Sequence, residues 1–88
     1  MLKINNLEKC FKEAKKDGVE FVGVLISMDG FEKPEIIING CENFDKKLEY
    51  YKGAYNEDLT LKAAPDKVKI IGFTMGDTFE EIENLLFG

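Results

Sequence analysis

The chain of 88 residues contains no histidine, arginine, tryptophan or glutamine. Without histidine there is no Ser-His or Cys-His nucleophile pair and no imidazole general base. A zinc site would have to combine the two cysteines with carboxylates, which is an unusual ligand set. Without arginine the chain lacks the planar donor fork that binds phosphate or guanine at two points. We therefore expect no catalytic residues of these kinds, no metal site and no cofactor.

Basic charge and long apolar runs are missing as well. The formal net charge of −5 argues against direct binding to nucleic acid. No segment approaches the roughly 20 apolar residues of a membrane helix, and residues 1–6 lack the apolar core of a signal peptide. We expect a single cytoplasmic domain over residues 1–88, with no membrane and no nucleic-acid partner. The acidic balance leaves room for an inhibitor that occupies a basic partner in place of nucleic acid.

The longest apolar stretch spans residues 19–28, and Glu20 is its only charged residue. Valine, isoleucine and phenylalanine crowd it, which favours a strand over a helix. Side chains of a strand alternate between the two faces of a sheet, and here both sets are apolar. The stretch is therefore predicted to be the central strand of a sheet that is covered on both sides.

Asp29-Gly30 follows the central strand, and an Asp-Gly pair between apolar runs is a strong hairpin signal. The returning strand is predicted over residues 31–39. With a two-residue loop, Leu25 lies opposite Pro34 and the missing N–H of the proline points away from the central strand. This is tolerated at a sheet edge, so the returning strand is predicted to be an edge.

Three further segments carry apolar residues at helical spacing. They are residues 7–17, capped by Asn5 or Asn6 and ended by Gly18; residues 43–57; and a final helix that follows a cap at Asp77 or Thr78. The apolar stripe of the final helix comprises Phe79, Ile82, Leu85 and Leu86.

A last clear strand is predicted over residues 68–75, and residues 59–62 alternate like a short additional strand. Simple alternation places Val68 and Ile70 on one face of the last strand, and Ile71, Phe73 and Met75 on the other.

These elements give the order α-β-β-α-(β)-β-α. A right-handed crossover places the last strand beside the central one and antiparallel to it. The predicted fold class is α+β, with a three- to four-stranded, largely antiparallel sheet packed by three helices. Whether the helices cover both faces is open. If they cover only one, a second copy of the chain is the simplest cover for the other.

Two polar stretches are candidate sites. Cys41 is predicted to lie in an exposed loop, where it would be a reactive thiol or form an intermolecular disulfide, although Glu42 opposes a lowered pKa. The turn Gly76-Asp77-Thr78 joins a strand to a helix, and its backbone N–H groups could hold an anion. An ordinary capped helix explains this turn equally well, because acidic residues already occupy the positive end of the helix.

Other residues have two interpretations each. The acidic group Asp77, Glu80, Glu81 and Glu83 suggests a divalent-cation site or a solvated acidic face. Tyr50 is predicted to lie at the surface, as part of an interaction site, whereas Cys10 is predicted to be a buried structural thiol.

Charge is distributed unevenly along the chain. Residues 1–16 contain five lysines and two glutamates, a balance of +3, and residues 77–88 contain four acidic residues and no lysine. The first and last helices could therefore pack side by side, or meet between subunits, or remain two solvated faces, since exposed ion pairs are weak.

Two stretches, Phe31 to Asn39 (FEKPEIIIN) and Ile71 to Ile82 (IGFTMGDTFEEI), give the chain its general character. In its richness in Lys, Glu, Ile and Asn it resembles small uncharacterised proteins of AT-rich Gram-positive bacteria and their prophages. The resemblance carries over no catalytic residues, and it favours a small accessory or interaction protein.

Together these observations predict a non-enzymatic interaction or assembly module that self-associates, with a homodimer as the expected form. The alternative is a small-ligand or cation-binding protein, or a minor enzyme, that uses the turn from Met75 to Thr78. A second alternative is the acidic inhibitor of a basic partner. The candidate ligand or interface residues are Cys41, Tyr50, Gly76, Asp77 and Thr78.

Overall fold

The computed structural model describes residues 2–88 and shows an α+β fold with three helices and a three-stranded antiparallel sheet. The elements are α1 (Ile4–Asp17), β1 (Phe21–Met28), β2 (Glu35–Gly40), a 3₁₀ turn (Cys41–Asn43), α2 (Phe44–Ala54), β3 (Val68–Gly76) and α3 (Phe79–Phe87). Their order matches the prediction, apart from the additional strand at residues 59–62. Among the described residues, no helix is long and apolar enough to span a membrane.

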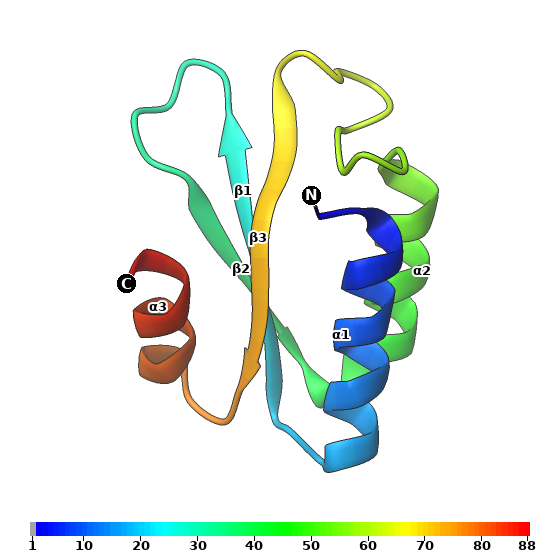
Figure 1. Cartoon of the computed structure of the whole chain (residues 1–88), viewed down its shortest axis with the longest axis vertical. Helices are drawn as coiled ribbons and strands as arrows, with labels where there is room; N and C mark the ends of the chain where they lie inside the picture. The colour runs from blue at the N-terminus through cyan, green and yellow to red at the C-terminus, as the bar shows by residue number, and fades with distance from the viewer. Residues whose placement is uncertain (1) are drawn as a thin grey trace.

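The sheet separates two helical layers of unequal size (Figure 1). Helices α1 and α2 lie on one side and the shorter α3 lies on the other. The strand order is β2-β1-β3, so β1 is the middle strand, although it begins at Phe21 rather than at residue 19. Helices therefore lie on both faces, but one face receives two helices and the other receives a single helix of nine residues.

The α1/α2 side holds the main apolar core. Phe11 is 2% exposed and lies with its ring centroid 5.6 Å from that of Phe44 and 6.0 Å from that of Tyr51. Val22, Val24 and Ile26 meet these rings from β1, because alternate residues of a strand point to the same face. The helical stripes of α1 and α2 thus close this face of the sheet.

Helix α1 begins three residues before the predicted start, with Lys3 as its N-cap. Asn6 still contributes to the cap, because its Oδ1 accepts a 2.8 Å hydrogen bond from the backbone N–H of Lys3. Gly18 ends the helix at φ +69°, in the left-handed region where glycine carries no steric cost, as the sequence predicts.

The predicted two-residue hairpin is wrong. In the observed register Leu25 lies opposite Ile36 rather than Pro34, so the pairing is shifted by two residues. Pro34 precedes the strand instead of lying within it. The Met28–Phe31 turn does form, with the N–H of Phe31 donating to Met28 O at 3.2 Å. However, Asp29 N–H donates to Lys67 O, and the chain continues as a loop until Glu35.

The predicted faces of β3 are also wrong, because a β-bulge lies between Ile70 and Gly72. Ile26 pairs with Ile70 and Leu25 pairs with Gly72, which leaves Ile71 as the extra residue. The bulge reverses the alternation, so residues on either side of it share the main core. Val68, Ile70, Phe73 and Met75 all pack there, and Ile71 is 45% exposed.

Residues 59–62 do not form a fourth strand. They make isolated bridges, between Tyr55 and Leu61 and between Thr60 and Lys69. Helix α2 ends at Ala54, three residues before the predicted end, because Tyr55 is already extended at φ −115° and ψ 147°. Gly53 marks this early end and not a close contact, since a Cβ there would meet nothing within 4 Å.

Candidate functional site

Helix α3 rests on three glycines of the sheet. A Cβ on Gly23 would overlap the Cγ2 of Ile82, one on Gly76 would lie 3.1 Å from Ile82 Cγ1, and one on Gly72 would lie 3.5 Å from Leu86 Cδ2. The register brings these glycines together from β1 and β3. Their missing side chains let α3 approach the backbone closely, and Ile82 is fully buried as a result.

The rest of this face is only partly covered, and we call it the open apolar surface. Pairing with Leu25 and Gly23 places Ile36 and Ile38 of β2 on the same side of the sheet as α3, since directly opposed residues share a face. On α3, Phe79 is 56% exposed and Leu85 is 61% exposed, so half of the predicted stripe faces solvent. The open apolar surface is thus made of Phe21, Ile36 and Ile38 from the sheet, and Phe79, Leu85, Leu86 and Phe87 from α3.

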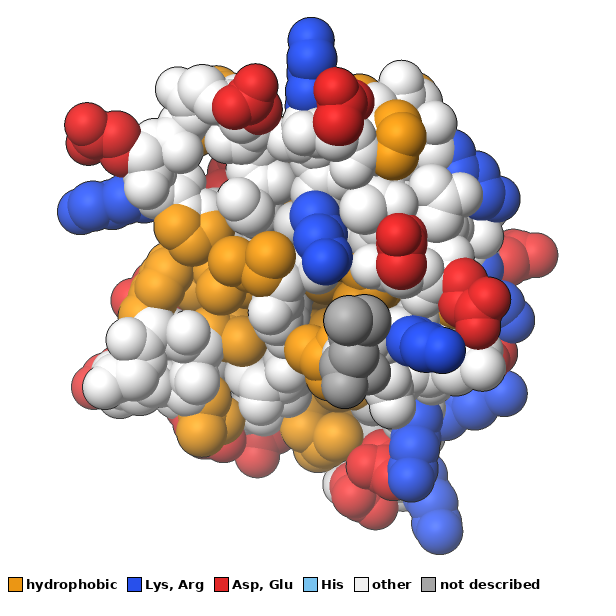
Figure 2. All heavy atoms as spheres, turned by 45° about the horizontal axis from the view of Figure 1, so that its top comes forward, with side chains coloured by type: hydrophobic (Ala, Val, Ile, Leu, Met, Phe, Trp, Pro, Cys, Tyr) orange, Lys and Arg blue, Asp and Glu red, His pale blue; other side chains and the backbone are white. Residues whose placement is uncertain are grey.

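A space-filling view shows hydrophobic side chains gathered on the α3 side of the molecule, at the left, where they are interrupted by few charged groups (Figure 2). One pair within the surface is already formed, because the rings of Phe21 and Phe79 lie 4.9 Å apart between centroids. Large contiguous apolar patches are uncommon on monomeric proteins and mark interaction sites. The arrangement can therefore bind another apolar surface, and it offers no chemistry for bond making.

Cys41 lies where the sequence places it, exposed at the start of the 3₁₀ turn. Its Sγ is 3.7 Å from Glu42 Oε2. Desolvation and the nearby carboxylates of Glu20 and Glu42 raise the pKa of the thiol above its ordinary value. Because the thiolate is the nucleophilic form, this environment disfavours a reactive cysteine.

The turn at Gly76, Asp77 and Thr78 uses its polar groups within the protein. Asp77 Oδ1 accepts a hydrogen bond from the backbone N–H of Glu20 at 3.1 Å. Thr78 is the N-cap of α3, and its Oγ1 accepts from Glu81 N–H at 3.1 Å. Gly76 is buried beneath Ile82. These contacts are those of a capped helix, and no specific observation favours a bound ligand here.

Tyr50 has the predicted exposure, whereas Cys10 is less buried than predicted. Tyr50 is 54% exposed on α2, with Lys47 Nζ 5.1 Å from its ring centroid. Cys10 is half-buried, and burial followed by the charge of Glu13 raises its pKa to about 11. The structure brings Cys41 and Asp77 to the same end of β1, because Cys41 N–H donates to Glu20 O and Asp77 Oδ1 accepts from Glu20 N–H. Tyr50 lies on α2, in the opposite layer from the open apolar surface.

Three hollows on the surface lie elsewhere. One of about 300 Å³ follows the outer side of α1, one of about 400 Å³ lies between Ser27–Phe31 and Pro65–Lys69, and one of about 190 Å³ lies at the β3 edge beside Ile71. None is lined by the turn at residues 75–78. Within residues 2–88, no three Cys, Asp or Glu side chains are grouped so that they could hold a metal ion.

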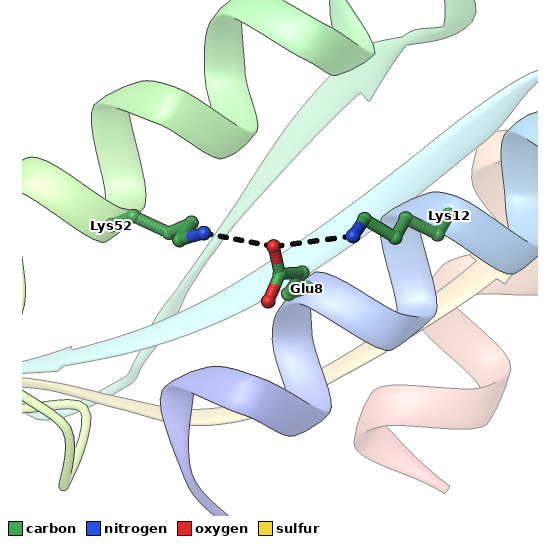
Figure 3. Close-up of polar contacts among 3 residues, drawn as sticks. All are labelled: Glu8, Lys12 and Lys52. Atoms are coloured by element: carbon green, nitrogen blue, oxygen red, sulfur yellow. Dashed lines mark hydrogen bonds and ion pairs between the residues drawn. The ribbon is translucent and has the colours of Figure 1, made fainter.

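The basic α1 and the acidic α3 do not pack side by side, because the sheet lies between them (Figure 1). The lysines of α1 instead find acidic partners in their own layer. Glu8 Oε2 lies 2.8 Å from Lys52 Nζ of α2 and 3.5 Å from Lys12 Nζ (Figure 3). Lys15 Nζ similarly lies 2.8 Å from Asp45 Oδ2. The acidic residues of α3 remain on the other side of the molecule.

None of the residues of the open apolar surface is among the candidate residues that the sequence suggests. One signal was present: Leu85, Leu86 and Phe87 are consecutive, and three consecutive residues cannot all share the buried stripe of a helix. The sequence therefore requires exposed apolar residues at this end of α3. It does not show that Ile36 and Ile38 lie on the same side, because that depends on the register.

Comparison with known proteins does not add a family to this description. No protein-family model, no curated protein and no solved structure matches the chain.

Proposed function

We propose that this protein is a non-enzymatic interaction module that associates with a second copy of itself through the open apolar surface. The observation that carries the proposal is the exposure of Phe79 and Leu85 beside the half-buried Ile36 and Ile38. Burying apolar surface is the main driving force of protein association, at about 25 cal/mol per Å² removed from water. The cytoplasmic location expected from the sequence stays a prediction.

A two-fold symmetric contact between two copies fits the open apolar surface better than a head-to-tail contact between copies does. An apolar surface can pack against a second apolar surface of the same kind. Two copies related by a two-fold axis would therefore each bury the residues of the open apolar surface. A contact between the basic α1 of one copy and the acidic α3 of another would be head-to-tail, because the two helices lie on opposite faces. Such contacts build rings or open filaments. A mass that keeps growing with concentration would indicate open head-to-tail filaments and would count against the first arrangement.

Light scattering coupled to size-exclusion chromatography tests the proposal, with and without reductant. We expect a finite oligomer whose mass does not depend on reductant. A mass that falls to the monomer only when reductant is added would instead indicate a disulfide through the exposed Cys41. A monomer at every protein concentration would contradict self-association.

Phe79→Ser and Tyr50→Ser form a matched pair for the same measurement, because the two rings are 56% and 54% exposed but lie in opposite layers. We expect Phe79→Ser to weaken association and Tyr50→Ser to leave it unchanged. Equal effects of the two variants would mean that the open apolar surface is not the interface.

A further inference from the structure

The two outer edges of the sheet differ. Part of the β3 edge is covered, since Ile70 N–H donates to Leu59 O at 2.9 Å and Val68 O accepts from Leu61 N–H at 2.9 Å. A bulge at Ile71 also bends this edge, and bulges protect edges from pairing with another chain. The β2 edge has neither of these features, and among residues 2–88 no segment pairs with its outer side.

The hydrogen-bonding groups that point outward from β2 can be identified. Cys41 N–H donates to Glu20 O at 2.9 Å, which makes these two residues a hydrogen-bonded pair of the antiparallel ladder. Such pairs alternate with pairs whose N–H and C=O groups point away from the partner strand. Counting back along β2, the outward groups belong to Ile36, Ile38 and Gly40. Within the described chain, none of them has a hydrogen-bond partner on its outer side.

The sequence of β2 does not discourage pairing. Natural edge strands are usually protected by lysines, prolines, bulges or inward charges. Here Pro34 precedes the strand, Glu35 is its only charged residue, and the remainder is Ile-Ile-Ile-Asn-Gly. The side chains of Ile36 and Ile38 stand on the α3 side, next to the free backbone groups. The edge therefore presents donors, acceptors and apolar contacts together.

We infer that β2 pairs in antiparallel fashion with β2 of a second copy of the chain. This pairing rests on the proposed self-association and adds a second interface to it. With the two-fold axis at Ile38, the outward groups of Ile36 meet those of Gly40 of the second copy, and the two Ile38 residues bond to each other. Every outward group then has a partner, and the two three-stranded sheets become one continuous sheet.

A second copy is the occupant that fits this edge, because the strand is complementary to itself. In the pairing centred on Ile38, Glu35 lies opposite Cys41 of the second copy, so no like charges are directly opposed across the strands. The axis of this pairing is perpendicular to the sheet, and the α3 sides of both copies face the same way. The open apolar surfaces stay free for the face-to-face contact, whose axis lies in the plane of the sheet. If these two perpendicular two-fold axes intersect, the two contacts together close as a tetramer.

Charge variants at Ile38 test the pairing. We expect Ile38→Lys alone and Ile38→Glu alone to raise the dissociation constant of self-association about tenfold or more, and an equimolar mixture to restore the wild-type mass. Because Ile38 also belongs to the open apolar surface, the recovery in the mixture is the result specific to the edge, since the edge pairing sets the two Ile38 positions directly opposite each other. Ile38→Thr is the matched neutral variant, which keeps strand propensity and should retain association. A wild-type mass in both charged variants at every concentration would overturn the pairing.

Amide hydrogen exchange of the wild-type chain tests the pairing without any substitution. The amides of Ile36, Ile38 and Gly40 should become protected as protein concentration rises, whereas those of Ile37 and Asn39 should be protected throughout. If the chain is oligomeric while the first set exchanges like exposed amides, the edge pairing fails and self-association stands. If the chain is monomeric at every concentration, both fail.

Discussion

The two faces of the sheet are covered by different means. On the α1/α2 side, large rings such as Phe11, Phe44 and Tyr51 fill the space between helices and strands. On the α3 side, glycines remove side chains so that one short helix can lie against the backbone. Among the described residues, the buried apolar side chains outside the main cluster are Leu25 and Ile82. Large side chains fill the first face completely, whereas the second face is covered only where α3 lies on the glycines.

This difference separates stability from interaction. The free energy of unfolding should depend on the α1/α2 side, where apolar side chains are fully enclosed. Substitutions on the α3 side should chiefly change how the surface meets another molecule, except where they disturb the contact between Ile82 and the glycines. Four experiments test the comparison.

Phe11→Ala should have the largest effect, because Phe11 is 2% exposed at the centre of the main core. Removing a buried phenylalanine costs about 3–5 kcal/mol of unfolding free energy. Phe79→Ala, at a 56% exposed position of the other face, should change the stability of the isolated subunit by only about 0.5 kcal/mol. Urea unfolding at low protein concentration measures both. Similar losses would show that the two faces are equally closed.

Gly23→Ala should destabilise the protein by about 1–3 kcal/mol, since the added Cβ overlaps Ile82 Cγ2 and overpacking costs that much. Ile82→Ala removes the opposing atom, so the two substitutions should be non-additive in a double-mutant cycle. Gly53→Ala provides the control. A Cβ there meets nothing and should stabilise the protein by up to about 1 kcal/mol within the helix. Additive losses for Gly23 and Ile82 would contradict the close contact.

Thr78→Ala removes the N-cap of α3, whose Oγ1 accepts from Glu81 N–H. Loss of such a cap costs about 1 kcal/mol. Helix α3 alone covers its face of the sheet and buries few apolar side chains. We therefore expect the loss to appear as faster hydrogen exchange within residues 79–87, while amides of α1 keep their protection. Thr78→Ser keeps the acceptor and should behave like the wild type. Uniformly faster exchange would mean that α3 does not open separately.

The smallest effect is expected at Glu8, on the closed side. Its hydrogen bond with Lys52, together with the charges of Lys12 and Lys52, lowers the pKa of its carboxyl below the ordinary value. A carboxyl with a lowered folded-state pKa stabilises the protein above its unfolded pKa, and this contribution is lost as the pH falls through the folded-state pKa. An NMR titration should show the lowered pKa, and Lys52→Met or added salt should raise it. No response to either change would contradict the contact.

The sequence predicts the class and order of the elements because those depend on local patterns. The apolar spacing of α1, the doubly apolar β1 and the cap at Thr78 are each visible within a few neighbouring residues. Local patterns also identify Gly18 as the end of α1, since its positive φ relieves a strain that other residues would carry. These features require no knowledge of distant parts of the chain.

Register and face depend on distant contacts, and here the predictions fail. Asp29-Gly30 forms a turn, but the bond from Asp29 N–H to Lys67 O holds the chain away from a tight hairpin. The bulge at Ile71 reverses the alternation of β3 with no signal in the local pattern. The contact of α3 with the three glycines also depends on distant parts of the chain, because Gly23, Gly72 and Gly76 come together only when β1 and β3 are aligned.

Because of the bulge at Ile71, deletion of this one residue should leave the rest of the strand pairing unchanged. On either side of it the ladder between β1 and β3 is regular, with Ile26 opposite Ile70 and Leu25 opposite Gly72. A chain shortened by Ile71 would join these pairs without interruption, and every remaining side chain of β3 would keep its face. Loss of a residue such as Phe73 from the regular part would instead turn its neighbours to the wrong side. We therefore expect β3 to tolerate a change in length at this position, where the inserted residue adds little to the core.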